Sequence, residues 1–157
     1  MGVCGHDHDH LGLSGGALAA ELAGAERRCT AADQKLTAPR RRVLELLLHA
    51  GQPVKAYDLI AAFGEDGAPA KPPTVYRALE FLSKQGFAHR IESLNAYVAC
   101  RRGEDGHAAA FLICDCCGAT REIASAADPM QALGEAAGYA LTGVTIDAHG
   151  LCAACRS

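Results

Sequence analysis

Residues 71–86 read KPPTVYRALEFLSKQG. Two adjacent prolines fit the first turn of a helix but not its interior, so a helix is expected to begin here. Val75, Leu79 and Leu82 recur at helical spacing and predict a buried stripe. Arg77 then falls on a different, outward-facing side of the helix.

The segments on either side of this helix give it a context. Before it, helical patterns cover residues 17–32, the stretch between a capping Thr37 and Gly51, and residues 56–64. After it, the β-like runs FAHRIE and AYVAC flank SLN, which predicts a hairpin. Three helices followed by a hairpin are the pattern of a winged helix-turn-helix, a DNA-binding fold.

Charge is distributed unevenly along the 157 residues, whose formal net charge is −3. Residues 33–102 hold 11 Lys and Arg against 7 Asp and Glu, net +4, whereas residues 103–157 hold 2 against 7, net −5. The chain as a whole is therefore not a general polyanion binder. The predicted winged helix is the part expected to meet phosphates.

The last third of the chain differs in character from the winged helix. After the polar joint RRGEDGH we expect strands at residues 108–114 and 117–124, a helix at 127–138 and a third strand at 139–149. About 50 residues bury little apolar surface, so this part needs a staple or a partner.

Two pairs of cysteines can supply that staple. Cys114 and Cys117 are separated by two residues, and so are Cys152 and Cys155. Two C-x-x-C turns can close a tetrahedral Zn²⁺ shell, and four thiolates leave no open position, so such a site is structural. Cys116 breaks the spacing and is provisionally the one without a ligand role. The alternative is buried, unliganded cysteines or redox thiols.

The N-terminus shows no secretory signal. Residues 1–16 are rich in Gly, His and Asp and are expected to be a disordered tail. No Lys or Arg precedes the mildly apolar run at 11–20, and no membrane span is expected. We therefore expect a cytoplasmic protein whose paired cysteines bind metal instead of forming disulfides.

Three longer motifs together resemble a known family. They are AKPPTVYRALEFLSKQGFAHRIESLNAYVAC, HAAAFLICDCCGA and AHGLCAAC. In this order they resemble the ferric uptake regulator (Fur) superfamily, and in particular its zinc uptake regulator branch, from about residue 20 to residue 155. The resemblance implies an α+β chain with a winged-helix DNA-binding domain at 17–100, a hinge at 101–108 and a small α/β dimerisation domain at 109–157, stapled by a Cys4 zinc site.

The function that the resemblance implies is zinc-responsive repression. The protein is expected to bind double-stranded operator DNA as a homodimer when zinc is loaded, and to control genes of zinc uptake and homeostasis. Two zinc ions per chain are implied. The structural zinc ligands that match are Cys114, Cys117, Cys152 and Cys155. The regulatory zinc ligands that match are His89, Cys100, His107 and Glu122, which are too dispersed to be found by spacing alone.

Candidate DNA contacts follow from the predicted winged helix. Arg77 can donate two hydrogen bonds to a guanine edge in the major groove. Tyr76 and Thr74 can meet phosphate or a thymine methyl group, and Tyr57 matches a DNA-contacting position of the branch that the chain resembles. The candidates for phosphate contacts are Lys71, Arg40, Arg41 and Arg42.

Other functions remain open from sequence alone. An iron- or peroxide-sensing regulator of the same family is the main alternative, and a zinc-ribbon interaction module without sensing is a second, with one zinc per chain. An enzyme using His107 and Glu122 is not expected, because the H-x-E pairing of zinc deaminases is absent.

Overall fold

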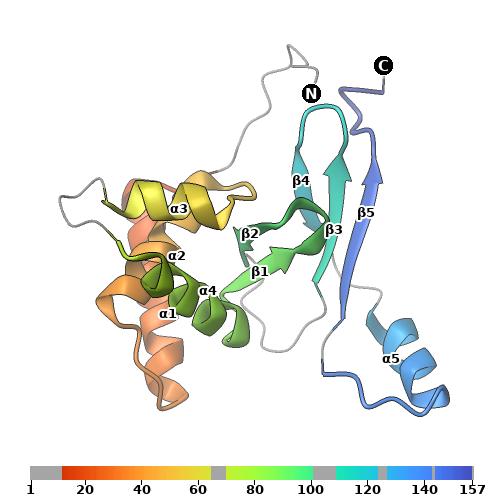
Figure 1. The fold of residues 1–157 in the computed structure, drawn as a ribbon, viewed down its shortest axis with the longest axis horizontal. Coiled ribbons are helices and arrows are strands. Elements are labelled where there is room, and N and C mark those ends of the chain that lie inside the picture. The colour runs from red at the N-terminus through yellow and green to blue at the C-terminus, as the bar shows by residue number, and fades with distance from the viewer. Residues whose placement is uncertain (1–11, 65–69, 101–108, 124–126, 143, 157) are drawn as a thin grey trace. The chain divides into compact units, whose positions relative to one another are not determined.

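A computed structural model describes residues 12–64, 70–100, 109–123, 127–142 and 144–156 (Figure 1). The chain divides into two compact units, one containing the described residues 12–100 and the other the described residues 109–156. We call them the winged-helix unit and the sheet unit and describe each by itself.

Four helices form the body of the winged-helix unit: α1 (Gly15–Ala31), α2 (Ala38–Ala50), α3 (Ala56–Phe63) and α4 (Pro72–Lys84) (Figure 1). Prolines occupy the first turns of α2 and α4, where a missing N–H costs nothing. Helix α2 ends at Gly51, whose φ of 63° is left-handed and suits glycine. The helices therefore begin and end where local chemistry dictates.

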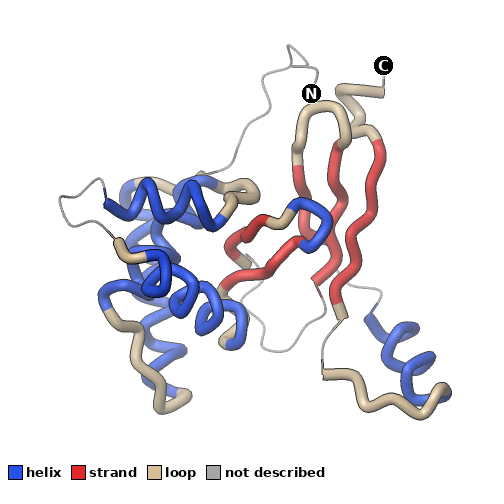
Figure 2. The backbone as a smooth tube through the Cα atoms, viewed as in Figure 1, coloured by secondary structure: helices blue, strands red, loops and turns tan. Residues whose placement is uncertain are grey.

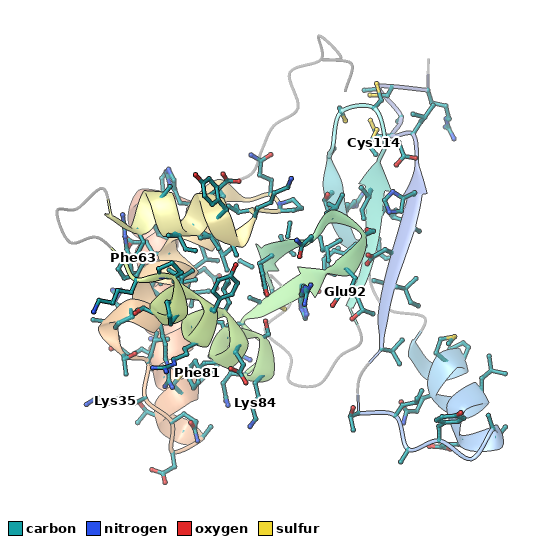
Figure 3. All side chains as sticks on the ribbon, in the orientation of Figure 1. Lys35, Phe63, Phe81, Lys84, Glu92 and Cys114 are labelled. Carbon is teal, nitrogen blue, oxygen red and sulfur yellow. The ribbon has the colours of Figure 1, made fainter. Side chains whose placement is uncertain are left out.

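The core of this unit lies between the helices, where their side chains cluster (Figure 3). Val43 and Leu47 of α2 and Val75 and Leu82 of α4 are fully buried. The predicted stripe on α4 is thus its inward face, which is confirmed for all three of its residues. Other buried members of the core are Leu22, Ala25, Cys29, Leu36, Leu44, Leu48, Leu59, Ala78, Leu79, Phe81, Phe87, Ala88 and Ala99.

The predicted hairpin follows α4 directly. Strands β1 (Ala88–Ile91) and β2 (Ala96–Ala99) pair antiparallel, with Ala88 opposite Ala99. A short 3-10 turn, Glu92–Leu94, joins them, and Asn95 takes the left-handed conformation that closes it. A single bridge from Val54 to Tyr97 ties the hairpin to the start of α3. These elements complete a winged helix.

The sheet unit consists of three strands and one helix (Figure 2): β3 (Ala109–Cys114), β4 (Thr120–Ile123), α5 (Ala127–Ala136) and β5 (Thr145–Gly150). The strand order is β4-β3-β5, with β4 antiparallel and β5 parallel to β3. A parallel pair needs a crossover, and the α5 segment lies between the two strands in sequence. Because β3 and β5 run the same way, their carboxyl ends meet at one edge of the sheet.

The expected α+β class is confirmed, with three differences in detail. The strand expected at 117–124 covers only Thr120–Ile123, because residues 115–117 form the turn that follows β3. Helix α1 begins at Gly15, inside the tail expected at 1–16, and residues 1–11 of that tail lie outside the described part of the chain. The strand expected at 139–149 begins only at Thr145. Gly138, with φ of 81°, and the hydrogen bond from the Tyr139 amide to the Gly134 carbonyl end α5 in a turn, so the strand cannot start there. No helix in the described ranges is long and apolar enough to cross a membrane.

Candidate metal centres and nucleic-acid interface

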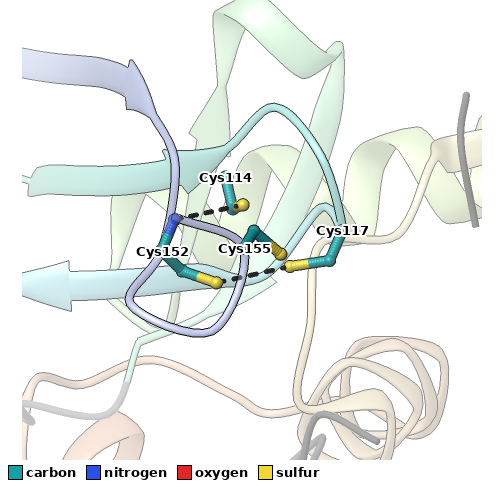
Figure 4. Close-up of side chains that lie close together, drawn as sticks. All are labelled: Cys114, Cys117, Cys152 and Cys155. Carbon is teal, nitrogen blue, oxygen red and sulfur yellow. Dashed lines mark hydrogen bonds between the residues drawn. The ribbon is translucent and has the colours of Figure 1, made fainter. Parts of the chain in front are cut away.

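Four cysteines meet at the carboxyl edge of the sheet unit (Figure 4). Cys114 is the last residue of β3, Cys117 lies in the turn that follows, and the other pair follows β5. The parallel register sets Cys114 beside Gly150, so the two C-x-x-C turns emerge next to one another. The sulfur atoms of Cys114, Cys117, Cys152 and Cys155 all lie within 4.8 Å of one another.

Each turn is shaped by backbone hydrogen bonds. In the first, the Gly118 amide donates to the Cys114 carbonyl at 2.9 Å, and Gly118 has a φ of 75° that glycine adopts readily. In the second, the Cys155 amide donates to the Cys152 carbonyl at 3.0 Å. The turns therefore form from the chain's own hydrogen bonds and present the sulfurs inward.

The spacing of the sulfurs fits a tetrahedral zinc ion. A Zn–S bond of about 2.3 Å implies sulfur-to-sulfur edges of about 3.8 Å in a tetrahedron. The Cys117 and Cys152 sulfurs are 3.8 Å apart. Four thiolates would fill the shell, so this cluster could hold a structural zinc and would leave no position for a substrate.

The electrostatics of the cluster also suit a cation. Backbone N–H groups of Cys117 and Cys152 point at the Cys114 sulfur and hold its pKa at about 6, against an opposing effect of burial. The Cys152 amide lies 3.3 Å from that sulfur. Burial, followed by hydrogen bonding to the neighbouring thiols, raises the pKa of Cys155 to about 12. The Cys114 thiolate therefore forms readily, whereas the Cys155 thiol keeps its proton, chiefly because burial disfavours its charged form.

Cys116 lies in the first turn but is not a member of the cluster. It is disulfide-bonded, whereas the four cluster cysteines are free thiols. The structure thus selects the pair that the C-x-x-C spacing indicates.

The predicted regulatory ligands fall in both units. On the hairpin, His89 lies on β1 and Cys100 directly follows β2, and their ligand atoms lie within 4.8 Å of each other. Both side chains are half-buried. Glu122 is on β4 of the sheet unit, and His107 lies outside the described residues. Within the winged-helix unit, the structure therefore brings together one half of the proposed ligand set, which we call the hairpin half-site, His89 and Cys100.

The candidate DNA contacts lie on α3 and α4. Tyr76 and Arg77 project from the outward face of α4, where Tyr76 is 51% exposed. Lys71 caps the start of α4 and is exposed, and Thr74 in its first turn is half-buried. Tyr57 on α3 is 79% exposed. Large aromatic side chains at such exposure, beside an arginine, are suited to a nucleic-acid surface.

Arg40 has contacts that the sequence did not indicate. Its guanidinium lies 3.6 Å from the centroid of the Phe81 ring and donates to the Lys35 carbonyl at 2.6 Å. Phe81 belongs to α4, so Arg40 connects the first turn of α2 to α4. Arg41 and Arg42 are half-buried, and Arg42 forms an ion pair with Glu45 at 3.0 Å.

Two residues beside the four cysteines form a contact that the sequence did not indicate. His149 Nδ1 and Asp115 Oδ1 lie 2.8 Å apart, and the Asp115 amide donates to the Gly150 carbonyl at 2.8 Å. Asp115 belongs to the first cysteine turn and His149 precedes the second. In the sequence, only their positions next to the C-x-x-C pairs could have indicated a role. That they pair with each other across 34 residues follows only from the β3–β5 register.

A winged helix with exposed Tyr and Arg on α4, joined in one chain to a unit with a four-thiolate centre, defines a metal-binding winged-helix protein. The chain belongs to the ferric uptake regulator family, whose model matches residues 31–149.

Relatives and solved structures agree with this membership. The zinc uptake regulation protein of Escherichia coli (strain K12) is 45% identical over 137 residues, which cover 85% of this chain and 80% of that protein. A zinc uptake regulator complexed with zinc and DNA is 43% identical with a TM-score of 0.84, over 90% of this chain and 97% of that one. Holo XcZur is 39% identical with a TM-score of 0.79, over 87% and 97%.

Proposed function

We propose that this protein is a zinc-responsive transcriptional repressor. It binds double-stranded operator DNA as a homodimer when its regulatory site is zinc-loaded, and it controls genes of zinc uptake and homeostasis. The free thiols of the four-cysteine cluster and DNA as the proposed partner support a cytoplasmic location for this activity. The similarity to a zinc uptake regulator in complex with zinc and DNA, over 90% of the chain, supports this function.

The observation that carries the proposal is the position of the hairpin half-site. His89 and Cys100 offer an imidazole and a thiolate, a donor pair that suits Zn²⁺. They lie on the hairpin that immediately follows α4, the helix with exposed Tyr76 and Arg77. A metal-binding pair and a DNA-reading helix are therefore neighbours in sequence within one unit.

The complete regulatory site is proposed to consist of His89, Cys100, His107 and Glu122. With the thiolate of Cys100 and the carboxylate of Glu122, the ligand set carries two negative charges, which a bound Zn²⁺ neutralises. This site and the four-cysteine staple give two zinc ions per chain. Because thiol and imidazole must lose their protons to bind, loading weakens as the pH falls.

The proposed mechanism follows from where the four ligands belong. His89 and Cys100 are on the hairpin, and Glu122 is on β4 of the sheet unit. Joint ligation by both units selects one arrangement of the two, and in a two-fold dimer this sets the distance between the α4 helices. Operator half-sites lie about 34 Å or a multiple apart, so only the matching arrangement binds tightly. By linkage, operator binding raises zinc affinity by the same factor.

Operator contacts are proposed for the exposed residues of α3 and α4. Arg77 reads a base edge, and Tyr76, Thr74 and Tyr57 contact phosphate or a thymine methyl group. Lys71 and Arg40 contact phosphates. Because its guanidinium stacks on Phe81, Arg40 would present only its remaining N–H donors to DNA.

Metal content and metal selectivity test the function directly. We expect two zinc ions per chain, one of which a mild chelator removes together with operator binding, and we expect Zn²⁺ to restore that binding better than Fe²⁺. Restoration by Fe²⁺ alone would favour the iron-sensing alternative. A single tightly held zinc with no metal effect on DNA would favour a zinc-ribbon interaction module.

The Cys100→Ser variant tests the regulatory ligand set. It should keep the structural zinc and the fold but lose zinc-dependent operator binding, measured by fluorescence anisotropy against free Zn²⁺. Cys116→Ser is the control, since Cys116 lies outside both ligand sets, and it should retain both zinc ions although it loses a disulfide. Full zinc-dependent binding by Cys100→Ser would contradict the assignment.

A further inference from the structure

The short segment between α4 and β1 centres on Phe87, a buried residue that joins three elements. Its amide donates to the Leu82 carbonyl of α4 at 2.8 Å, and its carbonyl accepts from the Cys100 amide at 2.9 Å. Its ring is 6% exposed and belongs to the core of the winged-helix unit. Phe87 therefore connects α4 to the hairpin half-site through two backbone hydrogen bonds, one made by its amide and one by its carbonyl.

The Phe87 ring is held from α1. The Cζ atom of Arg28, in the last turn of that helix, lies 4.5 Å from the ring centroid. A guanidinium over an aromatic face is attracted by the ring quadrupole, more strongly where water is excluded. Gly86, just before the ring, has a φ of 74°, so the chain turns sharply here and a side chain would be strained. The position of Phe87 thus depends on the turn and on Arg28.

The hairpin half-site depends in turn on Phe87. The hydrogen bond to the Phe87 carbonyl fixes the Cys100 backbone, and the next pair in register, Ala88 with Ala99, leads to His89. Moving the Phe87 backbone would move both donors or break that bond. Groups that orient metal ligands without touching the metal strongly affect metal affinity.

We propose that Arg28 and Phe87 are positioning residues for regulatory zinc, in addition to the ligands themselves. Arg28 holds the Phe87 ring, and Phe87 holds Cys100 and, through the strand register, His89. Helix α1 is by this means part of the zinc-sensing apparatus, although it contributes no ligand. The inference rests on the function proposed above.

The experiment compares the full-length protein with its Arg28→Ala, Arg28→Lys and Arg27→Ala variants. Arg27 is the exposed neighbour on the same helix and serves as the control for loss of a positive charge. Each protein keeps zinc at the four cysteines, and its second site is titrated with Zn²⁺ against a chromophoric chelator. Co²⁺ is then used at the second site, because the thiolate-to-cobalt absorption band reports the Cys100 ligand geometry.

Arg28→Ala should weaken zinc at the second site by roughly fivefold, the size of one partly desolvated cation–π contact. It should also change the cobalt spectrum. Arg28→Lys, which can still place a cation over the ring, should stay within about twofold of the wild type, and Arg27→Ala should match the wild type. Phe87→Leu, which keeps an apolar but smaller side chain and removes the aromatic face, should reproduce at least the effect of Arg28→Ala.

Two results would overturn the inference while leaving the proposed function intact. In the first, Arg28→Ala lowers the melting temperature but leaves the zinc midpoint and the cobalt spectrum unchanged, which assigns Arg28 to stability alone. In the second, Arg27→Ala weakens zinc as much as Arg28→Ala, which assigns the effect to general charge. A wild-type protein without a second zinc would contradict the proposed function itself, and this inference with it.

Discussion

The two units of this chain are stabilised in different ways. The winged-helix unit has a continuous apolar core drawn from four helices and the hairpin, with Leu47, Leu79 and Leu82 at 1% exposure or less. The buried residues described in the sheet unit are only Ala110, Phe111, Ile113 and Cys114. One unit can fold by burying apolar surface, whereas the other has little to bury and brings four thiols to one point instead. Under the proposed function, zinc would therefore act as a folding element in the sheet unit and as a signal at the hairpin half-site.

The largest expected effect comes from removing one ligand of the staple. Structural zinc contributes on the order of 10 kcal/mol to folding in small domains. Cys152→Ser should therefore abolish hydrogen-exchange protection across the described residues 109–156 while residues 12–100 remain protected, as measured by mass spectrometry on the full chain. Cys116→Ser, which removes a disulfide from the first cysteine turn but no cluster ligand, should leave protection and zinc content unchanged and so separates loss of zinc from loss of a disulfide. Persisting protection of β3 and β5 in a zinc-free Cys152→Ser protein would break the comparison.

In the winged-helix unit, the corresponding test is to remove apolar volume from the core instead of a metal ligand. Leu47 of α2 has no exposed surface, and Leu47→Ala should cost about 2–5 kcal/mol in the free energy of unfolding of that unit. The effect should be the same with and without added zinc, because the cavity lies in an apolar core. The measurement is urea denaturation followed by circular dichroism.

Leu46→Ala provides the matched control for this core, since Leu46 precedes Leu47 on the same helix and is only partly buried. It should cost less than half as much. Equal losses from the two variants would show that the unit is not stabilised by the core that its burial pattern describes.

The same contrast explains how much could be predicted from sequence. The stripe of Val75, Leu79 and Leu82 and the two C-x-x-C pairs were predictable, because helical spacing and metal-ligand spacing are local properties. The prediction that the last strand begins at residue 139 was wrong, because residues 139–144 have a strand-like composition. Gly138 and the Tyr139 amide instead close the end of α5 in a turn, so no strand can begin at residue 139.

Contacts between distant residues were not predictable in the same way. The stacking of Arg40 on Phe81 and of Arg28 on Phe87 joins separate helices or segments, and one basic residue on a helix looks like any other in the sequence. The dispersed set His89, Cys100, His107 and Glu122 came from the family resemblance. The structure brings the His89 and Cys100 donors together on the hairpin, and the full set stays a prediction.

Sequence-specific DNA binding is expected to depend on the winged-helix unit. Arg77→Ala should cost about 1–3 kcal/mol for the operator and relax the preference for one base pair. Lys71 is the exposed N-cap residue of the same helix. Lys71→Ala should weaken binding to all DNA sequences alike and reduce the slope of log affinity against log salt concentration by about one unit. Both are measured by anisotropy with operator and scrambled duplexes at several salt concentrations. Equal losses on both duplexes from Arg77→Ala would remove its role as a base reader.

The smallest expected effect concerns the contact between Asp115 Oδ1 in the first cysteine turn and His149 Nδ1 near the end of β5. Asp115 and His149 are 58% and 39% exposed, and exposed pairs contribute only about 0.2–1 kcal/mol. Asp115→Ala should therefore speed the release of structural zinc to a chelator by no more than about fivefold, while Asp115→Asn, which keeps an oxygen acceptor, should change it less. Glu135→Ala, an exposed carboxylate on α5, controls for net charge. The four thiolates and the parallel β3–β5 register, and not this pair, are expected to hold the turns together. A release rate raised a hundredfold by Asp115→Ala alone would show that the metal centre depends on a surface contact, and the sheet unit would then have a second staple.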